Sequence, residues 1–304
     1  MDNRNVSEAL HREPAERAGR SDINVADLAA RIRQLTVTSI YHAGSGHPGG
    51  SLSAVDLLAT LYGWELNLDK NDLTNEDRDR FVLSKGHACP ALYAAWAACG
   101  FISPQSVTTL RKLGSPLQGH PHVIDMPLAE TSTGSLGQGF STAVGMAIGQ
   151  RHRKSPARVY TMLGDGELQE GQVWEAAMSA SHHKLDNLCA IVDYNKLQSD
   201  DRNANIMGLE PLAVRWRSFG WHAIEIDGHN LDDIKSAFDS ARLTDGLPTV
   251  IIAHTIKGKG VSYMEDSAPW HGSVKLSDDD IARALQDLSL DNATAQDWID
   301  GIVN

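Results

Sequence analysis

The architecture of this chain is best inferred from one stretch, Val159-Tyr160-Thr161-Met162-Leu163-Gly164-Asp165-Gly166-Glu167. Its first half has the composition of a short buried strand, and a Gly-Asp-Gly turn follows directly. Residues 170–183 have the apolar spacing of a helix, and residues 188–192 form a second β-rich run. This strand, helix, strand order predicts two parallel strands joined by a crossover helix.

The same alternation extends over most of the chain. Further β-rich runs lie at residues 80–84, 222–226 and 249–253, and helical stretches lie at 23–42, 51–64, 87–99, 138–151, 211–219 and 231–241. Such alternation predicts an α/β fold, with a parallel sheet and helices on both faces. We expect a single domain over residues 21–304 with a helical C-terminus from about 277 to 303, preceded by a disordered tail over residues 1–20. Ser21 or Asp22 is placed to cap the first helix.

Composition and charge exclude several classes of protein. The 304 residues have a formal net charge of −12, whereas broad binding to nucleic acid or anionic membranes depends on clustered Lys and Arg. The sequence has no run of about 18 apolar residues that could span a bilayer, and its N-terminus lacks the layout of a secretion signal. The three cysteines, Cys89, Cys99 and Cys189, form no Cys-x-x-Cys pair and favour buried thiols in a reducing compartment. We therefore expect a cytoplasmic protein.

Two polar segments follow neighbouring strands of the predicted sheet. Asp165 lies in the Gly-Asp-Gly turn, and Asn195 lies in Asp193-Tyr194-Asn195-Lys196-Leu197 after the next strand. Because ligands bind beyond the carboxyl ends of parallel strands, we expect Asp165 and Asn195 to meet. A carboxylate, an amide oxygen and a backbone carbonyl suit Mg²⁺, and Gly166 lets a diphosphate approach backbone N–H groups. Either fragment alone is more typical of a turn, but together they favour a metal and diphosphate site.

Longer motifs surround these residues. One is Gly164-Asp165-Gly166-Glu167-Leu168-Gln169-Glu170-Gly171, with Trp174-Glu175-Ala176 behind it. The others, in chain order, are Ser45-Gly46-His47-Pro48-Gly49, Leu83-Ser84-Lys85-Gly86-His87-Ala88, Gly119-His120-Pro121, Thr133-Gly134-Ser135-Leu136-Gly137-Gln138-Gly139 and Trp270-His271-Gly272. With these motifs the chain, from about residue 25 to 275, resembles the transketolase family of thiamine diphosphate enzymes. The resemblance implies the thiamine diphosphate-binding fold, in the domain that holds the diphosphate.

The resemblance also implies a role for each matching residue. Asp165, Asn195 and the carbonyl of Leu197 would ligate Mg²⁺, or another divalent cation such as Ca²⁺ or Mn²⁺, and the backbone of Gly166 would contact the diphosphate. The catalytic histidines His47, His120 and His271 would face the thiazolium and the donor's hydroxyls. His87 and Lys257 would lie at the diphosphate. Gly134 and Leu136 would meet the aminopyrimidine through their backbone, and Glu170 would lie near the partner's catalytic carboxylate. Imidazoles suit this work because they exchange protons near neutral pH. The remaining candidates, His11, His152, His182, His183, His222 and His229, are expected to be structural or exposed.

The family's second domain has no counterpart among these motifs, which already occupy the available strands and helices. The resemblance therefore implies a separate C-terminal subunit that binds the aminopyrimidine, in an α2β2 heterotetramer. The expected reaction is transfer of a two-carbon ketol unit from a ketose to an aldose in carbohydrate metabolism, as in the pentose phosphate reactions. The sequence leaves the sugar open between phosphorylated, sulfonated and branched substrates.

Three alternative functions remain open from the sequence. The chain resembles, less closely, a 1-deoxyxylulose 5-phosphate synthase or the α subunit of a 2-oxoacid dehydrogenase, and it is compatible with a non-catalytic cofactor-binding paralogue. Two further patterns carry less weight. Gly44-x-Gly46-x-x-Gly49 matches the dinucleotide fingerprint but follows a predicted helix instead of a strand. His120-x-His122 has a zinc-like spacing but no further ligand nearby in the sequence.

Overall fold

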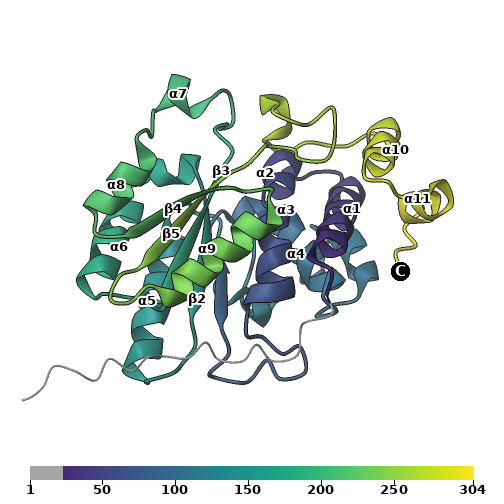
Figure 1. The fold of residues 1–304 in the computed structure, drawn as a ribbon. Coiled ribbons are helices and arrows are strands. Elements are labelled where there is room, and N and C mark those ends of the chain that lie inside the picture. Colours follow the sequence, from purple (N-terminus) through teal and green to yellow (C-terminus); the bar gives the residue numbers. More distant parts are fainter. Residues whose placement is uncertain (1–22) are drawn as a thin grey trace, which may run out of the picture.

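The computed structural model describes residues 23–304, so the tail predicted for residues 1–20 lies outside the described residues. The centre of the fold is a five-stranded sheet in the order β1-β2-β3-β5-β4, and every neighbouring pair of strands is parallel (Figure 1). The strands are β1 (Arg80–Leu83), β2 (Val159–Gly164), β3 (Leu188–Tyr194), β4 (His222–Asp227) and β5 (Thr249–His254). The predicted parallel sheet is confirmed, and each predicted strand starts at the expected residue and ends within two residues of its expected end.

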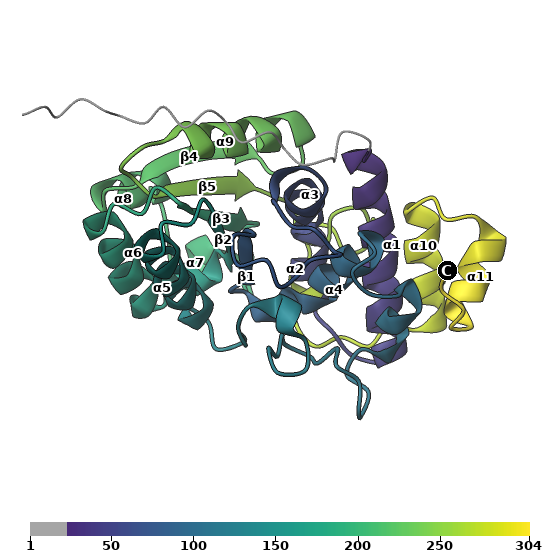
Figure 2. The same ribbon diagram turned by 90° about the horizontal axis from the view of Figure 1, so that it is seen from below.

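Helices cover both faces of the sheet, as predicted (Figure 2). The helices are α1 (Val25–Ala43), α2 (Pro48–Ser53), α3 (Val55–Thr60), α4 (Cys89–Ala98), α5 (Gln138–His152), α6 (Gly171–His182), α7 (Asn203–Ile206), α8 (Leu212–Ser218), α9 (Leu231–Leu243), α10 (Asp278–Asp287) and α11 (Asn292–Ile299). One face is covered by α3, α4 and α9, with α1 packed outside α3 and α4, and the other face is covered by α5, α6 and α8. Successive strand residues alternate between the two cores: Tyr160 and Met162 join the first, and Val159 and Leu163 join the second.

Two of the predicted helices begin at other residues than expected. The first helix is capped by Asn24, whose Oδ1 accepts a hydrogen bond from the Ala26 N–H at 3.0 Å, and not by Ser21 or Asp22. Asparagine is as good a cap as either residue, so the sequence does not distinguish them. The helix expected at 51–64 starts earlier, at Pro48, and is divided at Ala54 into α2 and α3. Proline is favoured at the first helical position because its missing N–H is not needed there.

The helical C-terminus is two helices instead of one continuous segment. Ser277 and Asp280 form a reciprocal capping box at the start of α10, and the Asp291 side chain caps α11. Between the two helices Ser289 has a φ of 58°, which is incompatible with continuing a right-handed helix. The two helices lie beside α1, at the right of Figure 1.

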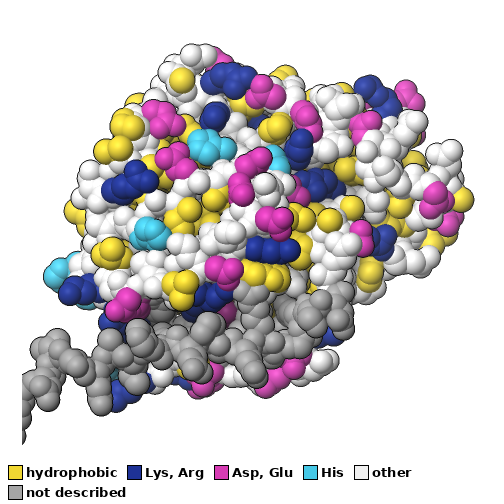
Figure 3. Space-filling model, viewed as in Figure 1, with side chains coloured by type: hydrophobic (Ala, Val, Ile, Leu, Met, Phe, Trp, Pro, Cys, Tyr) yellow, Lys and Arg dark blue, Asp and Glu magenta, His cyan; other side chains and the backbone are white. Residues whose placement is uncertain are grey.

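The helices and the surface give two further observations. Within residues 23–304, none of the helices is both long enough and apolar enough to cross a bilayer. The face seen in Figure 3 has acidic and basic side chains interspersed instead of gathered by sign.

Candidate active site at the carboxyl edge of the sheet

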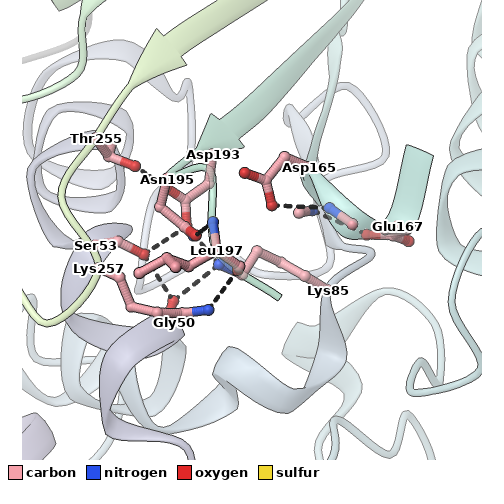
Figure 4. A network of polar contacts seen from close by, with 12 residues as sticks. Gly50, Ser53, Lys85, Asp165, Glu167, Asp193, Asn195, Leu197, Thr255 and Lys257 are labelled. Atoms are coloured by element: carbon pink, nitrogen blue, oxygen red, sulfur yellow. Dashed lines mark hydrogen bonds and ion pairs between the residues drawn. The ribbon is translucent and has the colours of Figure 1, made fainter. Parts of the chain in front are cut away.

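The loops that follow β1, β2, β3 and β5 meet at the carboxyl edge of the sheet (Figure 4). The segments of Asp165 and Asn195 lie side by side there, as the sequence predicted. The N–H of Lys196 donates to Oδ2 of Asp165 at 2.5 Å, and the N–H of Gly166 donates to Oδ1 at 2.8 Å. Asn195 Oδ1 accepts from the N–H of Leu197 at 3.1 Å.

These groups fit a divalent cation. Among the described residues no three His, Cys, Asp or Glu side chains gather as a metal cluster, so a metal here depends on amide and carbonyl oxygens as well. Asp165, Asn195 and the Leu197 carbonyl offer such an all-oxygen set. Burial and the neighbouring Asp193 charge raise the pKa of Asp165 to about 6. A bound cation would lower this pKa again, because its positive charge favours the ionised carboxylate. The Leu197 carbonyl already accepts from Nζ of Lys257 at 2.5 Å, and its second lone pair remains available.

Next to the Asp165–Asn195 oxygen set lies a buried ion pair between Lys85 and Asp193, to which the sequence pattern gave no role. Asp193 is fully buried and accepts hydrogen bonds from Lys85, Thr255 and, at 2.6 Å, Ser53. Burial alone would raise the pKa of Asp193. The Lys85 ammonium and the hydrogen bonds lower this pKa by more than burial raises it, so it lies below the usual value. Lys85 also donates to the Gly50 carbonyl at 2.8 Å. Lys85 lies two residues after β1, at the same edge of the sheet as Asp165, but no feature of the sequence marks Asp193 as its partner.

Three of the four predicted histidines share one cluster. The ring centroids of His47 and His87 are 5.4 Å apart, those of His87 and His271 are 5.7 Å apart, and those of His47 and His271 are 6.4 Å apart. Nζ of Lys257 lies 2.5 Å from Nδ1 of His271, which connects this cluster to the Leu197 carbonyl. Loops far apart in the sequence therefore deliver imidazoles next to the predicted metal set.

The fourth histidine, His120, lies against Gly134 instead of within that cluster. A Cβ built on Gly134 would be 2.9 Å from Cδ2 of His120, and Gly134 has a φ of +142°. Only glycine suits this position, on both the contact and the backbone conformation. His120 thus packs on the segment of Gly134 and the half-buried Leu136, the pair predicted to meet an aminopyrimidine.

The histidine rings are held neutral. Burial, followed by the positive charge of Arg111, lowers the pKa of His47 to about 4, and burial followed by Lys257 lowers the pKa of His271 to about 3. Burial also lowers the pKa of His87 well below its usual value. Nδ1 of His47 is buried and has no hydrogen-bond partner. A neutral imidazole with a free nitrogen can bond to a hydroxyl and exchange a proton with it.

Glu167, which lies in the Gly-Asp-Gly-Glu motif, holds three further groups together. Its Oε1 accepts from the Ser84 hydroxyl at 2.5 Å and from the N–H of Gly137 at 2.8 Å, and its Oε2 accepts from the N–H of Gly164 at 3.0 Å. The buried carboxylate therefore ties the ends of β1 and β2 to the loop of Gly134 and Leu136.

The remaining candidates lie outside this cluster. Glu170 is exposed at the start of α6, beside Gly137. Gly44 caps α1 and Gly49 lies within α2, so the dinucleotide-like pattern joins two helices and lacks the preceding strand. His229 is structural: its Nδ1 bonds to Asp56 at 2.7 Å, and its Nε2 accepts from the N–H of Ile256 at 2.8 Å.

Comparison with known proteins agrees with this geometry. The family described as "Transketolase, thiamine diphosphate binding domain" matches residues 25–297. The chain is 44% identical over 271 residues to the 6-deoxy-6-sulfo-D-fructose transketolase subunit SqwG of Clostridium sp. strain MSTE9, covering 89% of this chain and 98% of that subunit. It is 43% identical to one subunit of the apulose-4-phosphate transketolase of Phocaeicola vulgatus, covering 81% of this chain and 87% of that relative.

A solved structure shows the same fold in a longer chain. Pichia stipitis transketolase, in complex with sedoheptulose 7-phosphate, superposes with a TM-score of 0.83 at 30% identity. The match covers 91% of this chain but 44% of that one, so the chain spans less than half the length of this single-chain relative. The family match, the two subunit relatives and the shared fold together show that the chain belongs to the transketolase family, as its thiamine diphosphate-binding N-terminal part.

Proposed function

We propose that the chain is the N-terminal subunit of a two-subunit transketolase. With a separate C-terminal subunit it transfers a two-carbon ketol unit from a ketose donor to an aldose acceptor, using thiamine diphosphate and Mg²⁺. The main support is the meeting, at one edge of the sheet, of the Asp165–Asn195 oxygen set and the neutral histidine cluster. That combination fits a metal-bound diphosphate beside a polyhydroxylated substrate.

Each part of the site has a distinct task in this proposal. Asp165, Asn195 and the Leu197 carbonyl hold the metal, and the Gly166 backbone, His87 and Lys257 bind the diphosphate. The backbone of Gly134 and Leu136 meets the aminopyrimidine. Bound thiamine diphosphate supplies an electron sink for carbon–carbon bond cleavage. His47, His120 and His271 orient the sugar hydroxyls and exchange protons with them at their ring nitrogens.

A partner subunit is supported by the relatives that match over nearly their whole length, since both are named as subunits. The exposure of Glu170 beside the Gly134–Gly137 loop supports a contact with a second chain there. We propose an α2β2 assembly of this chain with a C-terminal transketolase subunit. Its three cysteines form no Cys-x-x-Cys pair, which favours the reducing cytoplasm.

The substrates are sugar phosphates or related sugars. The two subunit relatives are named for a sulfonated ketose and for apulose 4-phosphate, so this chain's donor belongs to a range that includes sulfonated and branched sugars besides xylulose 5-phosphate and fructose 6-phosphate. A donor panel with the assembled enzyme distinguishes them.

Cofactor binding tests the site directly. Calorimetric titration of thiamine diphosphate, with and without Mg²⁺, should show metal-dependent binding that Asp165→Ala and Asn195→Ala abolish, because each removes a metal ligand. Asp245→Ala, an exposed residue between α9 and β5, is the matched control and should bind normally. Unchanged affinity in the Asp165 and Asn195 variants would refute the metal assignment.

A further inference from the structure

Arg111 occupies an unusual position that the proposed chemistry does not use. It is half-buried, has a φ of 61°, and its N–H donates to the Leu117 carbonyl at 2.9 Å. Left-handed backbone is uncommon for a residue other than glycine, and such residues cluster at functional sites. Its guanidinium pairs with no carboxylate among the described residues, which leaves its positive charge uncompensated.

The Arg111 side chain contacts each of three loops that hold predicted catalytic histidines. Its terminal nitrogen donates to the hydroxyl of Ser45 at 2.9 Å, next to His47, and to the hydroxyl of Ser273 at 3.0 Å, next to His271. It also lies on Gly119, which precedes His120: a Cβ built there would be 2.8 Å from Nε of Arg111.

Two of these loops are themselves paired. Gly46 and Val274 exchange backbone hydrogen bonds of 3.1 Å and 2.8 Å, so the loops of His47 and His271 form an isolated antiparallel bridge. Arg111 adds side-chain bonds to both strands of that bridge and joins them to the loop of His120. The three loops follow different elements, and no other described side chain hydrogen-bonds to both Ser45 and Ser273.

We propose that Arg111 is a positioning residue that clamps the loops of His47, His120 and His271 together and places its positive charge beside the first two rings. The inference rests on the proposed function for its kinetic consequence, because misplacing a reacting group by about 1 Å can cost about 100-fold in rate. Its structural and electrostatic consequences do not depend on that function.

The charge has a defined sign of effect. After burial, Arg111 is the largest influence that lowers the pKa of His47, and the same holds for His120. The groups that face His47 are Arg111, His120, Lys257, Lys85, His87 and His271. Each of these groups is positively charged when it is ionised, so none of them favours protonation of His47. Removing the Arg111 charge therefore makes protonation of His47 and His120 easier and raises their pKa values.

The test combines ring titration of the chain alone with kinetics of the assembled enzyme. Nuclear magnetic resonance follows the pKa of His47 and His120 in the wild type, Arg111→Met, Arg111→Lys, the double variant Ser45→Ala/Ser273→Ala, and Lys112→Met. Lys112 is the adjacent exposed residue, so Lys112→Met makes the same charge change without removing the bonds to Ser45 and Ser273.

The clamp predicts a different pattern for each variant. Arg111→Met raises the pKa of His47 and His120 and lowers kcat/KM about 10- to 100-fold, because the loops lose their shared contact. It also moves the acid limb of the pH profile to higher pH, because the two rings then take up protons at a higher pH. Arg111→Lys restores the ring pKa values but only part of the rate, since lysine is a point charge without the planar fork. Ser45→Ala/Ser273→Ala lowers the rate with the ring pKa values unchanged, and Lys112→Met behaves as wild type.

Ring pKa values and kcat/KM in Arg111→Met that match those of Lys112→Met overturn the proposal. If Arg111→Met does not fold, an unchanged kcat/KM in Ser45→Ala/Ser273→Ala overturns the clamp and a reduced one supports it. A wild-type pair without ketol transfer refutes the proposed function instead, and the ring titration of the chain alone still decides the role of Arg111.

Discussion

Single residues at this site do their work by being kept uncharged or by being paired. The His47 ring is neutral because burial and surrounding cations oppose protonation, and Asp193 is ionised because Lys85 compensates it. Each state makes folding stability depend on a condition. Stability falls when the His47 ring must be protonated at low pH, and it falls when the Asp193 carboxylate loses Lys85.

Stability at acidic pH measures the cost at His47. The folded pKa of about 4 lies below the ordinary value of 6.5, so the unfolded chain binds more protons between these values. His47 therefore contributes full stability above about pH 6.5 and loses it as the pH falls toward 4. We expect His47→Asn to lose less stability than wild type between pH 7 and pH 5 in urea unfolding. Parallel losses in both proteins would show that His47 titrates normally.

The sequence was most informative at residues that end strands. Asp165 and Asn195 were predictable because a polar residue directly after an apolar run lies at the carboxyl edge. Glu167 and Asp193 were not, because their partners, Ser84 and Lys85, are distant in sequence. Arg111 gave no local signal at all, since its left-handed backbone and loop contacts depend on tertiary structure.

At the scale of elements, buried ions fasten helices and loops to the sheet. Asp193, at the end of β3, receives bonds from Ser53 of α2, from Lys85 after β1 and from Thr255 after β5. The hydrophobic pattern located the strands correctly but gave the wrong bounds for α2. It could not show how α2 is held, because the periodicity of a helix does not report its polar partners.

Breaking this ion pair should destabilise the fold. Asp193→Ala leaves Lys85 buried without a counter-charge, and we expect a loss of about 3–5 kcal/mol in the free energy of unfolding. The surface pair Arg153–Glu76, whose side chains are 44% and 75% exposed, is the control. Glu76→Ala should cost about 1 kcal/mol or less, and an equal loss in both variants would contradict the role of burial.

Glu167 should couple two loops in the same way. Glu167→Ala leaves the N–H groups of Gly137 and Gly164 without their acceptor, at a cost of about 1–3 kcal/mol for each buried unpaired group. We also expect weaker thiamine diphosphate binding by calorimetry, because the Gly134–Gly137 loop loses its tie to β2. Glu175→Ala, exposed on α6, should alter neither quantity. Normal cofactor affinity in Glu167→Ala would show that the loop is held by other contacts.

At the scale of the whole molecule, one sheet separates two apolar cores and gathers the site at its carboxyl edge (Figure 2). The two cores share every strand, which supports our proposal that the chain forms a single domain. The parallel order followed from the alternation of runs in the sequence. The division of the C-terminal helix at Ser289 did not, since its amphipathic pattern continues on both sides.

We propose that this chain is one half of a transketolase. The most direct measurement is two-carbon transfer to ribose 5-phosphate, with thiamine diphosphate, Mg²⁺ and a panel of phosphorylated and sulfonated ketoses. It is made with the chain alone and with the chain co-expressed with a C-terminal transketolase subunit. We predict transfer only by the pair. Equal transfer by the chain alone would contradict the need for a partner, and no transfer by a pair that binds the cofactor would contradict the proposed activity.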